Sequence, residues 1–120
     1  VHKLAQERDS LSFVDDQFGH PTFTSDLAPL LYRLALDRRS GLFHGTNQGA
    51  VSWYGFVQEI VRLMGKDPAM VLPISTAELQ PPRPAQRPAN SVLDNKALRD
   101  AGYQATRDFR EPLAELLKLL

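Results

Sequence analysis

The sequence predicts a mixed α/β (α+β) domain, a small helical lobe with a few short strands. Three observations predict this class. The chain has 120 residues, of which 42% are hydrophobic and 23% are charged, as in one ordinary globular domain. Four segments place apolar residues at helical spacing, and three short runs bounded by turn residues favour strands. A compact chain of this length has a radius of gyration of about 14 Å.

The first predicted helix follows Thr24 and is closed by Gly41. Ser25 is expected to cap its start, where the early acid Asp26 suits the positive end of the helix dipole. Pro29 is tolerated because it falls in the first turn. The apolar positions that define this helix are Leu27, Leu30, Leu31, Leu34 and Ala35.

The second predicted helix begins at Ser52, which is expected to cap it, and ends at Gly65. One apolar stripe runs along it, made of Trp53, Phe56, Val57, Ile60, Val61 and Met64. This stripe places Trp53 in the core. Stacking of Trp53 or Tyr54 on a sugar or base is the alternative for these aromatic side chains.

Two shorter helices complete the set. One covers residues 95–101, with Asp94 as its cap and Gly102 as its end. The last opens with Asp108 and Glu111, which have the spacing of a capping box. Its inward residues are expected to be Phe109, Leu113, Leu116, Leu117 and Leu120.

Strands are predicted for Leu11–Val14, for residues 42–45, which include His44, and for residues 70–74. Four of the nine prolines fall within residues 80–88. Because proline fixes φ and lacks an N–H donor, this stretch is predicted to be extended and outside any hydrogen-bonded ladder, as a strap or a linker.

Composition excludes several function classes. Fourteen basic residues balance fourteen acidic ones, so no cationic field is present to bind nucleic acid or an anionic membrane. With no cysteine there is no disulfide, thiolate zinc site or cysteine nucleophile, and the three histidines lack metal-ligand spacing. No apolar run is long enough to cross a bilayer, and the N-terminus is no signal peptide, so a cytoplasmic protein is expected. The missing initiator Met indicates a piece of something longer.

The usual motifs of cofactor and nucleophile chemistry are also missing. No G-x-G-x-x-G turn occurs, and Gly65-Lys66 is followed by Asp67 where a phosphate-binding loop needs Ser or Thr. Ser52 has the wrong spacing for a nucleophile elbow. The neighbouring Asp15 and Asp16 are expected to point to opposite faces, so they form no shared acid–base pair.

Two segments remain as candidate binding elements. The loop of residues 15–22 contains His20 between Gly19, which is able to adopt positive φ, and Pro21, and turn formation is its simplest interpretation. The strap of residues 80–88 carries Arg83 and Arg87, which are either solvated surface side chains or bidentate donors to a phosphate or carboxylate.

Four stretches in this order resemble the C-terminal part of dTDP-4-dehydrorhamnose reductases, a branch of the extended short-chain dehydrogenase/reductases. They read VDDQFGHPTFTSDLA at residues 14–28, GLFHGT at 41–46, SWYGF at 52–56 and RPANSVLDN at 87–95. The patterns Asp-Asp-Gln-x-Gly-x-Pro-Thr and Arg-Pro-x-x-Ser-x-Leu-Asp are specific to this branch. The likeness covers nearly the whole chain.

The resemblance implies a division of labour. Intact family enzymes reduce dTDP-4-dehydro-L-rhamnose with NADPH or NADH, and their N-terminal Rossmann domain carries the glycine-rich cofactor turn and a Tyr-x-x-x-Lys pair. No tyrosine here is followed by lysine four residues later; Leu36, Gln58 and Arg107 occupy those positions. Residues 1–120 therefore correspond to the substrate-binding lobe alone, which by itself is predicted to hold no catalytic residue, to bind no cofactor or metal, and to be inactive.

The resemblance also implies a site and partners. The substrate-binding residues it indicates are Gln17, Phe18, His20, Thr22, Arg83 and Arg87. Arg87 matches the family motif, whereas Arg83 fits a looser similarity to nucleotide-sugar epimerases, which place an arginine on the diphosphate. Expected partners are a dTDP-sugar, the N-terminal Rossmann domain, whose sheet the strand at residues 42–45 would join, and a second copy in a homo-oligomer. Two alternatives stay open: the regulatory NADP-binding subunit of methionine adenosyltransferase, and a non-catalytic interaction module.

Overall fold

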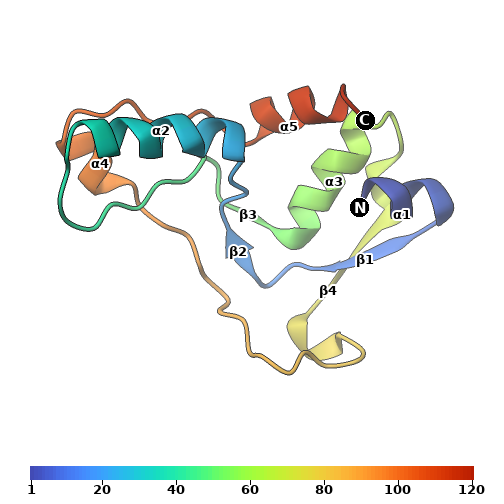
Figure 1. Cartoon of the computed structure of the whole chain (residues 1–120). Helices are drawn as coiled ribbons and strands as arrows, with labels where there is room; N and C mark the ends of the chain where they lie inside the picture. The colour runs from blue at the N-terminus through green and yellow to red at the C-terminus, as the bar shows by residue number, and fades with distance from the viewer.

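The computed structural model describes residues 1–120 and consists of a body from which an arm projects (Figure 1). The body contains the helices α1, α3 and α5 and the strands β1 and β4; the arm contains α2, residues 37–46 and α4. The molecule measures 49 × 34 × 19 Å, and its radius of gyration is 16.6 Å. The compact value of about 14 Å predicted from length is therefore wrong, because the arm extends away from the body instead of packing onto it.

The body is built on a parallel pair of strands, β1 (Leu11–Val14) and β4 (Val71–Ile74). Leu11 lies opposite Val71, and both side chains are buried against α3 (Trp53–Leu63). Two of the three predicted strands are thus confirmed, although Met70 belongs to the 3-10 turn Pro68–Met70 that precedes β4.

Helix α3 separates two apolar clusters. One face packs Val57 and Val61 against the strands, and the other packs Ile60 against Phe109 and Leu113 of the segment that forms α5 (Arg110–Leu117). The predicted cap is confirmed, because the Gly55 N–H donates to Ser52 Oγ over 3.1 Å. Gly65 follows the helix end with φ of +74°, as predicted for a glycine stop.

A short N-terminal helix, α1 (His2–Glu7), was not predicted. Its Ala5 is fully buried against α3, and Lys66 Nζ donates to the Ala5 carbonyl oxygen over 2.6 Å. Six residues give too few apolar repeats to define a helical period, so these tertiary contacts, not local pattern, fix α1.

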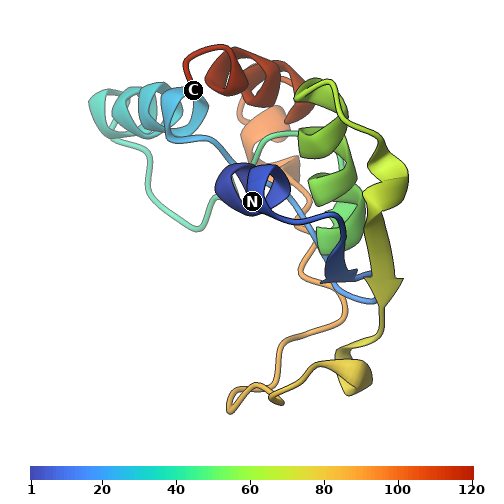
Figure 2. The same ribbon diagram turned by 90° about the vertical axis from the view of Figure 1, so that its right-hand side faces the viewer.

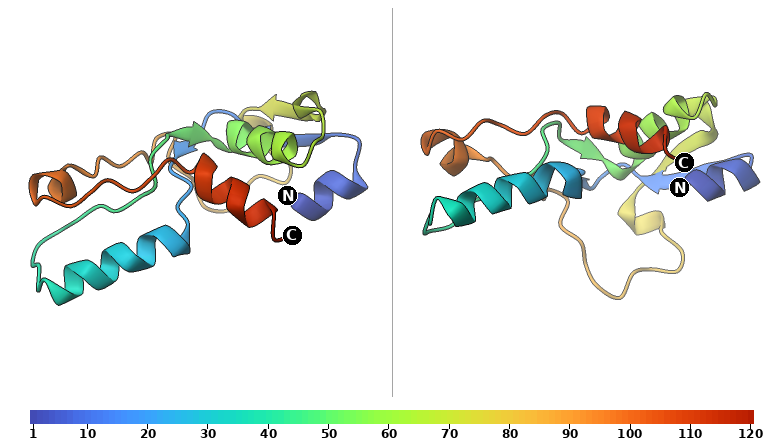
Figure 3. Two further views of the ribbon diagram at one scale, coloured as in Figure 1. Left: turned by 90° about the horizontal axis from the view of Figure 1, so that it is seen from above. Right: turned by 45° about the horizontal axis from the view of Figure 1, so that its top comes forward.

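The arm is formed by α2 (Thr24–Leu36) and α4 (Lys96–Asp100), which lie at the same end of the molecule in both views of Figure 3. The Tyr103 hydroxyl donates to Asp37 over 2.6 Å and accepts from Arg39 Nε over 3.2 Å, which ties the two helix ends together. Leu30 is the one buried side chain of α2. The arm therefore keeps much of its apolar surface in contact with solvent, including Leu31, Tyr32 and Leu36.

The predicted Ser25 cap is wrong. The cap position is Phe23, whose N–H donates to Asn47 Oδ1 over 2.8 Å. Asn47 is fully buried and also donates to Asp26 Oδ2 over 2.6 Å and to the Arg107 carbonyl over 3.0 Å. A side chain that comes from a distant part of the chain therefore satisfies the first turn of α2, which makes a local serine cap unnecessary.

Two further caps differ from prediction. Asn95, not Asp94, stands at the start of α4, and Asp94 instead accepts from Arg99 over 2.7 Å. At α5 the Asp108 carboxylate accepts from the Arg110 N–H over 3.0 Å, but no reciprocal contact with Glu111 completes a capping box. The expected inward residues Leu116 and Leu120 are exposed, because α5 contacts the body along the one face that carries Leu113 and Leu117.

The third predicted strand is absent. Residues 42–45 form an irregular segment, Leu42 is 80% exposed and His44 is also exposed. No neighbouring strand lies alongside them to complete a ladder, so β-favouring side chains alone do not produce a strand there. Two unpredicted strands, β2 (Phe18–Gly19) and β3 (Val51–Ser52), pair antiparallel instead. None of the helices combines the length and the hydrophobicity that a membrane span requires.

Candidate functional site

Three segments distant in sequence meet where β2 pairs with β3. Phe18 lies opposite Ser52 in this pair. On its other side Phe18 donates its N–H to the Ala89 carbonyl over 2.8 Å and accepts from the Ser91 N–H over 2.9 Å. The loop of residues 15–22, the start of α3 and the end of the strap are therefore held together by backbone hydrogen bonds.

These segments surround a cavity of about 600 Å³. Five of the six residues predicted to bind substrate line it, namely Gln17, Phe18, His20, Arg83 and Arg87. The sixth, Thr22, is not a lining residue, and its hydroxyl donates to the His20 carbonyl over 3.1 Å. The structure thus brings the predicted loop and the predicted strap together at one cavity. Thr22 instead forms a hydrogen bond within the loop itself.

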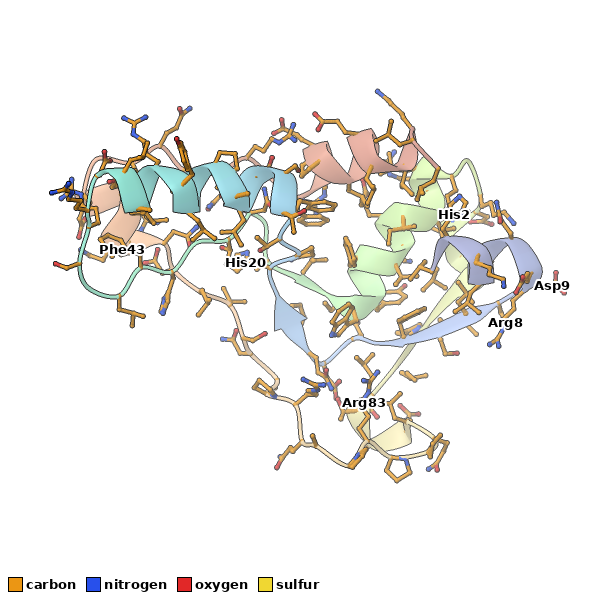
Figure 4. All side chains as sticks on the ribbon, in the orientation of Figure 1. His2, Arg8, Asp9, His20, Phe43 and Arg83 are labelled. Carbon is orange, nitrogen blue, oxygen red and sulfur yellow. The ribbon has the colours of Figure 1, made fainter.

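Both arginines of the strap are exposed to solvent. Figure 2 shows residues 80–88 projecting below the body, and Figure 4 shows Arg83 on this segment. All of these residues are exposed, as predicted for an extended segment outside any ladder. Arg83 and Arg87 each form no ion pair and no hydrogen bond with the rest of the chain, whereas Arg62, Arg99 and Arg107 are each paired with a carboxylate. Two unpaired guanidinium groups at a cavity are able to receive an anion.

His20 lies where the arm meets the body (Figure 4). Both nitrogens of its imidazole ring are buried, and neither has a hydrogen-bond partner in the protein. Buried polar atoms are almost always paired, because an unsatisfied one costs about 1–3 kcal/mol. His20 is therefore a polar group of the cavity wall whose hydrogen-bonding capacity the chain itself leaves unused.

The two aspartates beside the cavity serve separate elements, as predicted. Asp15 accepts from Ser52 Oγ over 2.5 Å, whereas Asp16 accepts from the Thr76 N–H over 2.9 Å and from its hydroxyl over 2.6 Å. These Thr76 hydrogen bonds, the hydroxyl's first, lower the pKa of the Asp16 carboxyl below its usual value. Buried Gln17 also donates to Thr76 Oγ1 over 2.9 Å. Thr76 lies just before the strap, so these contacts with Thr76 hold the N-terminal end of the strap and form its first anchor.

The prediction that Trp53 belongs to the core is wrong. Its side chain is 54% exposed and lines the cavity. Trp53 is the first residue of α3, and side chains in a helix point back toward its N-terminus, so at this position the indole projects beyond the helix instead of onto its neighbours. The position of Trp53 one residue after a confirmed cap is the signal that could have indicated this exposure.

Gly19 is able to adopt positive φ but does not do so in this structure. Its role is steric, because a Cβ at this position would lie 2.9 Å from Ser91 Oγ. The glycine therefore allows the strap end to lie directly against β2, which holds the nearby Arg87 at the cavity.

The family model for the RmlD substrate binding domain matches residues 1–120. A dTDP-4-dehydrorhamnose reductase of Streptomyces griseus is 41% identical over 118 residues and covers 94% of this chain. A dTDP-4-keto-6-deoxy-D-glucose reductase of Streptomyces niveus is 36% identical over 118 residues, 98% of this chain.

Solved structures of two dTDP-4-dehydrorhamnose reductases also match this chain. A dTDP-4-dehydrorhamnose reductase of Clostridium acetobutylicum superposes on 98% of the chain with a TM-score of 0.91 at 42% identity. The enzyme of Bacillus anthracis, in complex with NADP, superposes on 99% with a TM-score of 0.90 at 30% identity.

The fold is therefore that of the substrate-binding part of an extended short-chain dehydrogenase/reductase. Within that class, the chain belongs to the RmlD substrate binding domain family. It spans about two fifths of the proteins it matches, between 38% and 40% of the two Streptomyces relatives and 41% of each of the two solved chains.

The residues of this chain do not fit the nicotinamide dinucleotide that the fold family implies. Such a cofactor needs glycines that leave space for a pyrophosphate at a helix N-terminus. Gly49, which precedes α3, is closed in by protein, since a Cβ there would lie 2.6 Å from the Asp108 carboxylate and 2.9 Å from the Phe109 ring.

Proposed function

We propose that this chain is the nucleotide-sugar-binding lobe of a dTDP-4-dehydrorhamnose reductase, which reduces dTDP-4-dehydro-L-rhamnose to dTDP-L-rhamnose with NADPH or NADH. One observation carries the proposal: in a chain of this family, two arginines without any protein partner line the same cavity as three residues of the family's loop motif.

In this proposal the strap binds the diphosphate. A guanidinium group donates two parallel hydrogen bonds to a phosphate, which fixes orientation as well as adding affinity. Arg87 lies two residues before Ala89, whose backbone bonds to Phe18, so its position is defined by the fold. Arg83 lies further along the strap and lines the same cavity.

The loop of residues 15–22 supplies the opposite wall. Phe18 offers an apolar surface, and buried Gln17 keeps the loop attached to the strap's first anchor through Thr76. The free ring nitrogens of His20 are suited to ligand hydroxyl or carbonyl groups.

We further propose that an N-terminal Rossmann domain completes the protein and brings the cofactor. The chain exposes 8091 Å² of surface, against about 6,500 Å² expected for a compact monomer of its mass. The apolar side chains of α2 and Leu42 contribute to this excess and are available to such a domain. On its own, the lobe is proposed to be inactive. Homo-oligomer formation and a cytoplasmic location stay predictions.

The other two interpretations are not favoured. The relatives are named as reductases of dTDP-linked sugars, which matches neither a regulatory subunit of methionine adenosyltransferase nor a free-standing interaction module. Their names differ in the sugar, so the dTDP part is the better supported half of the substrate.

The test is Arg87→Ala in the complete reductase. The loss of one bidentate contact to the diphosphate, about 1.5–3 kcal/mol for a charged hydrogen bond, is expected to raise KM for the dTDP-sugar at least about tenfold. Arg8→Ala is the matched control, because Arg8 is exposed at the far end of the body (Figure 4). An unchanged KM in the Arg87 variant would remove the strap from the site.

A further inference from the structure

We propose that Trp53 is the platform on which the base of the nucleotide stacks, which makes it a specificity-determining residue of the site. This inference rests on the proposed function, because it takes the ligand to be a nucleoside diphosphate sugar. It adds a residue that the loop and strap motifs do not contain.

The indole of Trp53 packs against an aromatic neighbour and keeps a large part of its surface open. Its ring meets Phe56 edge to face, with centroids 6.5 Å apart and planes at 66°, and Phe56 meets the fully buried Phe109 in the same manner at 5.7 Å and 70°. This aromatic ladder extends from the core to the cavity. Trp53 is its outermost member and keeps 54% of its surface exposed.

No protein group uses the open surface of this indole. Guanidinium groups lie over two other aromatic rings, Arg39 over Tyr103 and Arg110 over Phe109, but none lies over Trp53. A large apolar ring, held in place yet uncovered within a cavity, is the arrangement that proteins use for stacking a planar base.

The arginines determine how a ligand lies in this cavity. Arg83 and Arg87 belong to the strap, whereas Trp53 belongs to the start of α3, and all three line the same space of about 600 Å³. That volume is within the usual range for small-molecule sites, about 300–1,000 Å³. A diphosphate bound by the strap leaves the wall formed by Trp53 and Phe18 for the apolar part of the ligand, and the base is the planar apolar group of a nucleotide.

The chain provides its own probe, because Trp53 is its only tryptophan. Titration of the 120-residue chain with thymidine diphosphate is expected to quench the tryptophan emission, whereas inorganic pyrophosphate, which has no base, is expected to bind the strap without quenching. Equal quenching by both ligands would overturn the assignment of the base to Trp53.

Calorimetry on variants completes the test. Trp53→Ala is expected to weaken thymidine diphosphate binding about tenfold and to leave pyrophosphate binding unchanged, since loss of base stacking on an aromatic side chain commonly has an effect of this size. Trp53→Phe is expected to restore most of the affinity. Tyr32→Ala, at an exposed aromatic position on the arm, is the control and should bind as the unaltered chain does.

The outcomes separate this inference from the proposed function. If thymidine diphosphate binds with unchanged emission, and if Arg87→Ala weakens binding while Trp53→Ala does not, the stacking role is overturned and the proposed function stands. If thymidine diphosphate does not bind the chain at all, both are overturned. Should Trp53→Ala fail to fold by circular dichroism, the emission titration of the unaltered chain still decides.

Discussion

The body's core and the strap have opposite properties. The core around α3 buries Val57, Val61 and Phe109 completely or almost completely. In the strap, residues 80–88 are all exposed and none of them makes a hydrogen bond to the rest of the chain. The residues that stabilise this fold and the residues proposed to bind its ligand are therefore separate sets. Proline restricts the strap by limiting the conformations of the chain, without any need for contacts.

Phe109→Ala should have the largest effect on stability. Phe109 is fully buried between Phe56 and the α5 residue Leu113, so its truncation is expected to reduce the free energy of unfolding by about 3–5 kcal/mol. Chemical denaturation monitored by circular dichroism measures this loss. Leu42→Ala, at a residue that is 80% exposed, is the control and should change stability little. A small loss for Phe109 would mean that the body has no stabilising core of the kind described.

His20 belongs to the proposed binding site, yet its ring nitrogens are buried like core atoms. The substitution His20→Leu should therefore increase stability. Leucine removes two buried nitrogens that have no partner, and the expected gain in the free energy of unfolding is about 1 kcal/mol. His44→Leu, at an exposed histidine, is the matched control and should show no gain. Destabilisation by His20→Leu, measured by thermal unfolding at pH 8, would indicate that the imidazole stabilises the unliganded fold.

The smallest effect is expected for the double substitution of Arg83→Ala with Arg87→Ala. Neither side chain has an ion-pair or hydrogen-bond partner, so the free energy of unfolding should change by less than about 0.5 kcal/mol. Thermal unfolding of the chain without ligand measures this. A loss above about 1 kcal/mol would mean that the strap does stabilise the fold, and the distinction between the two regions would fail.

Patterns confined to one element were predicted well from the sequence. The serine cap at Ser52, the glycine stop at Gly65 and the strand Leu11–Val14 depend on neighbouring residues, and the structure confirms all three. The proline-rich strap was also predicted, because proline imposes its conformation locally.

Features that depend on distant residues were not predictable in the same way. The start of α2 is capped by Asn47, which is more than twenty positions away from Phe23, and no local pattern indicates such a contact. Residues 42–45 have strand composition but no neighbouring strand in this chain. Trp53 lies on an apolar stripe whose first member extends past the helix end, so periodicity alone assigned it to the core.

The way in which the strap is attached has a consequence for how such proteins diversify. It is fastened before residue 80 through Thr76 and after residue 88 through Ala89, with no fastening between. Lengthening a flexible connection of this kind costs only about 0.6 kcal/mol for each doubling. Insertions or deletions there would move the guanidinium groups along the ligand while leaving the fold intact. A change in the length of this one segment would therefore alter where the ligand's diphosphate is bound, while the scaffold that carries the segment stays the same.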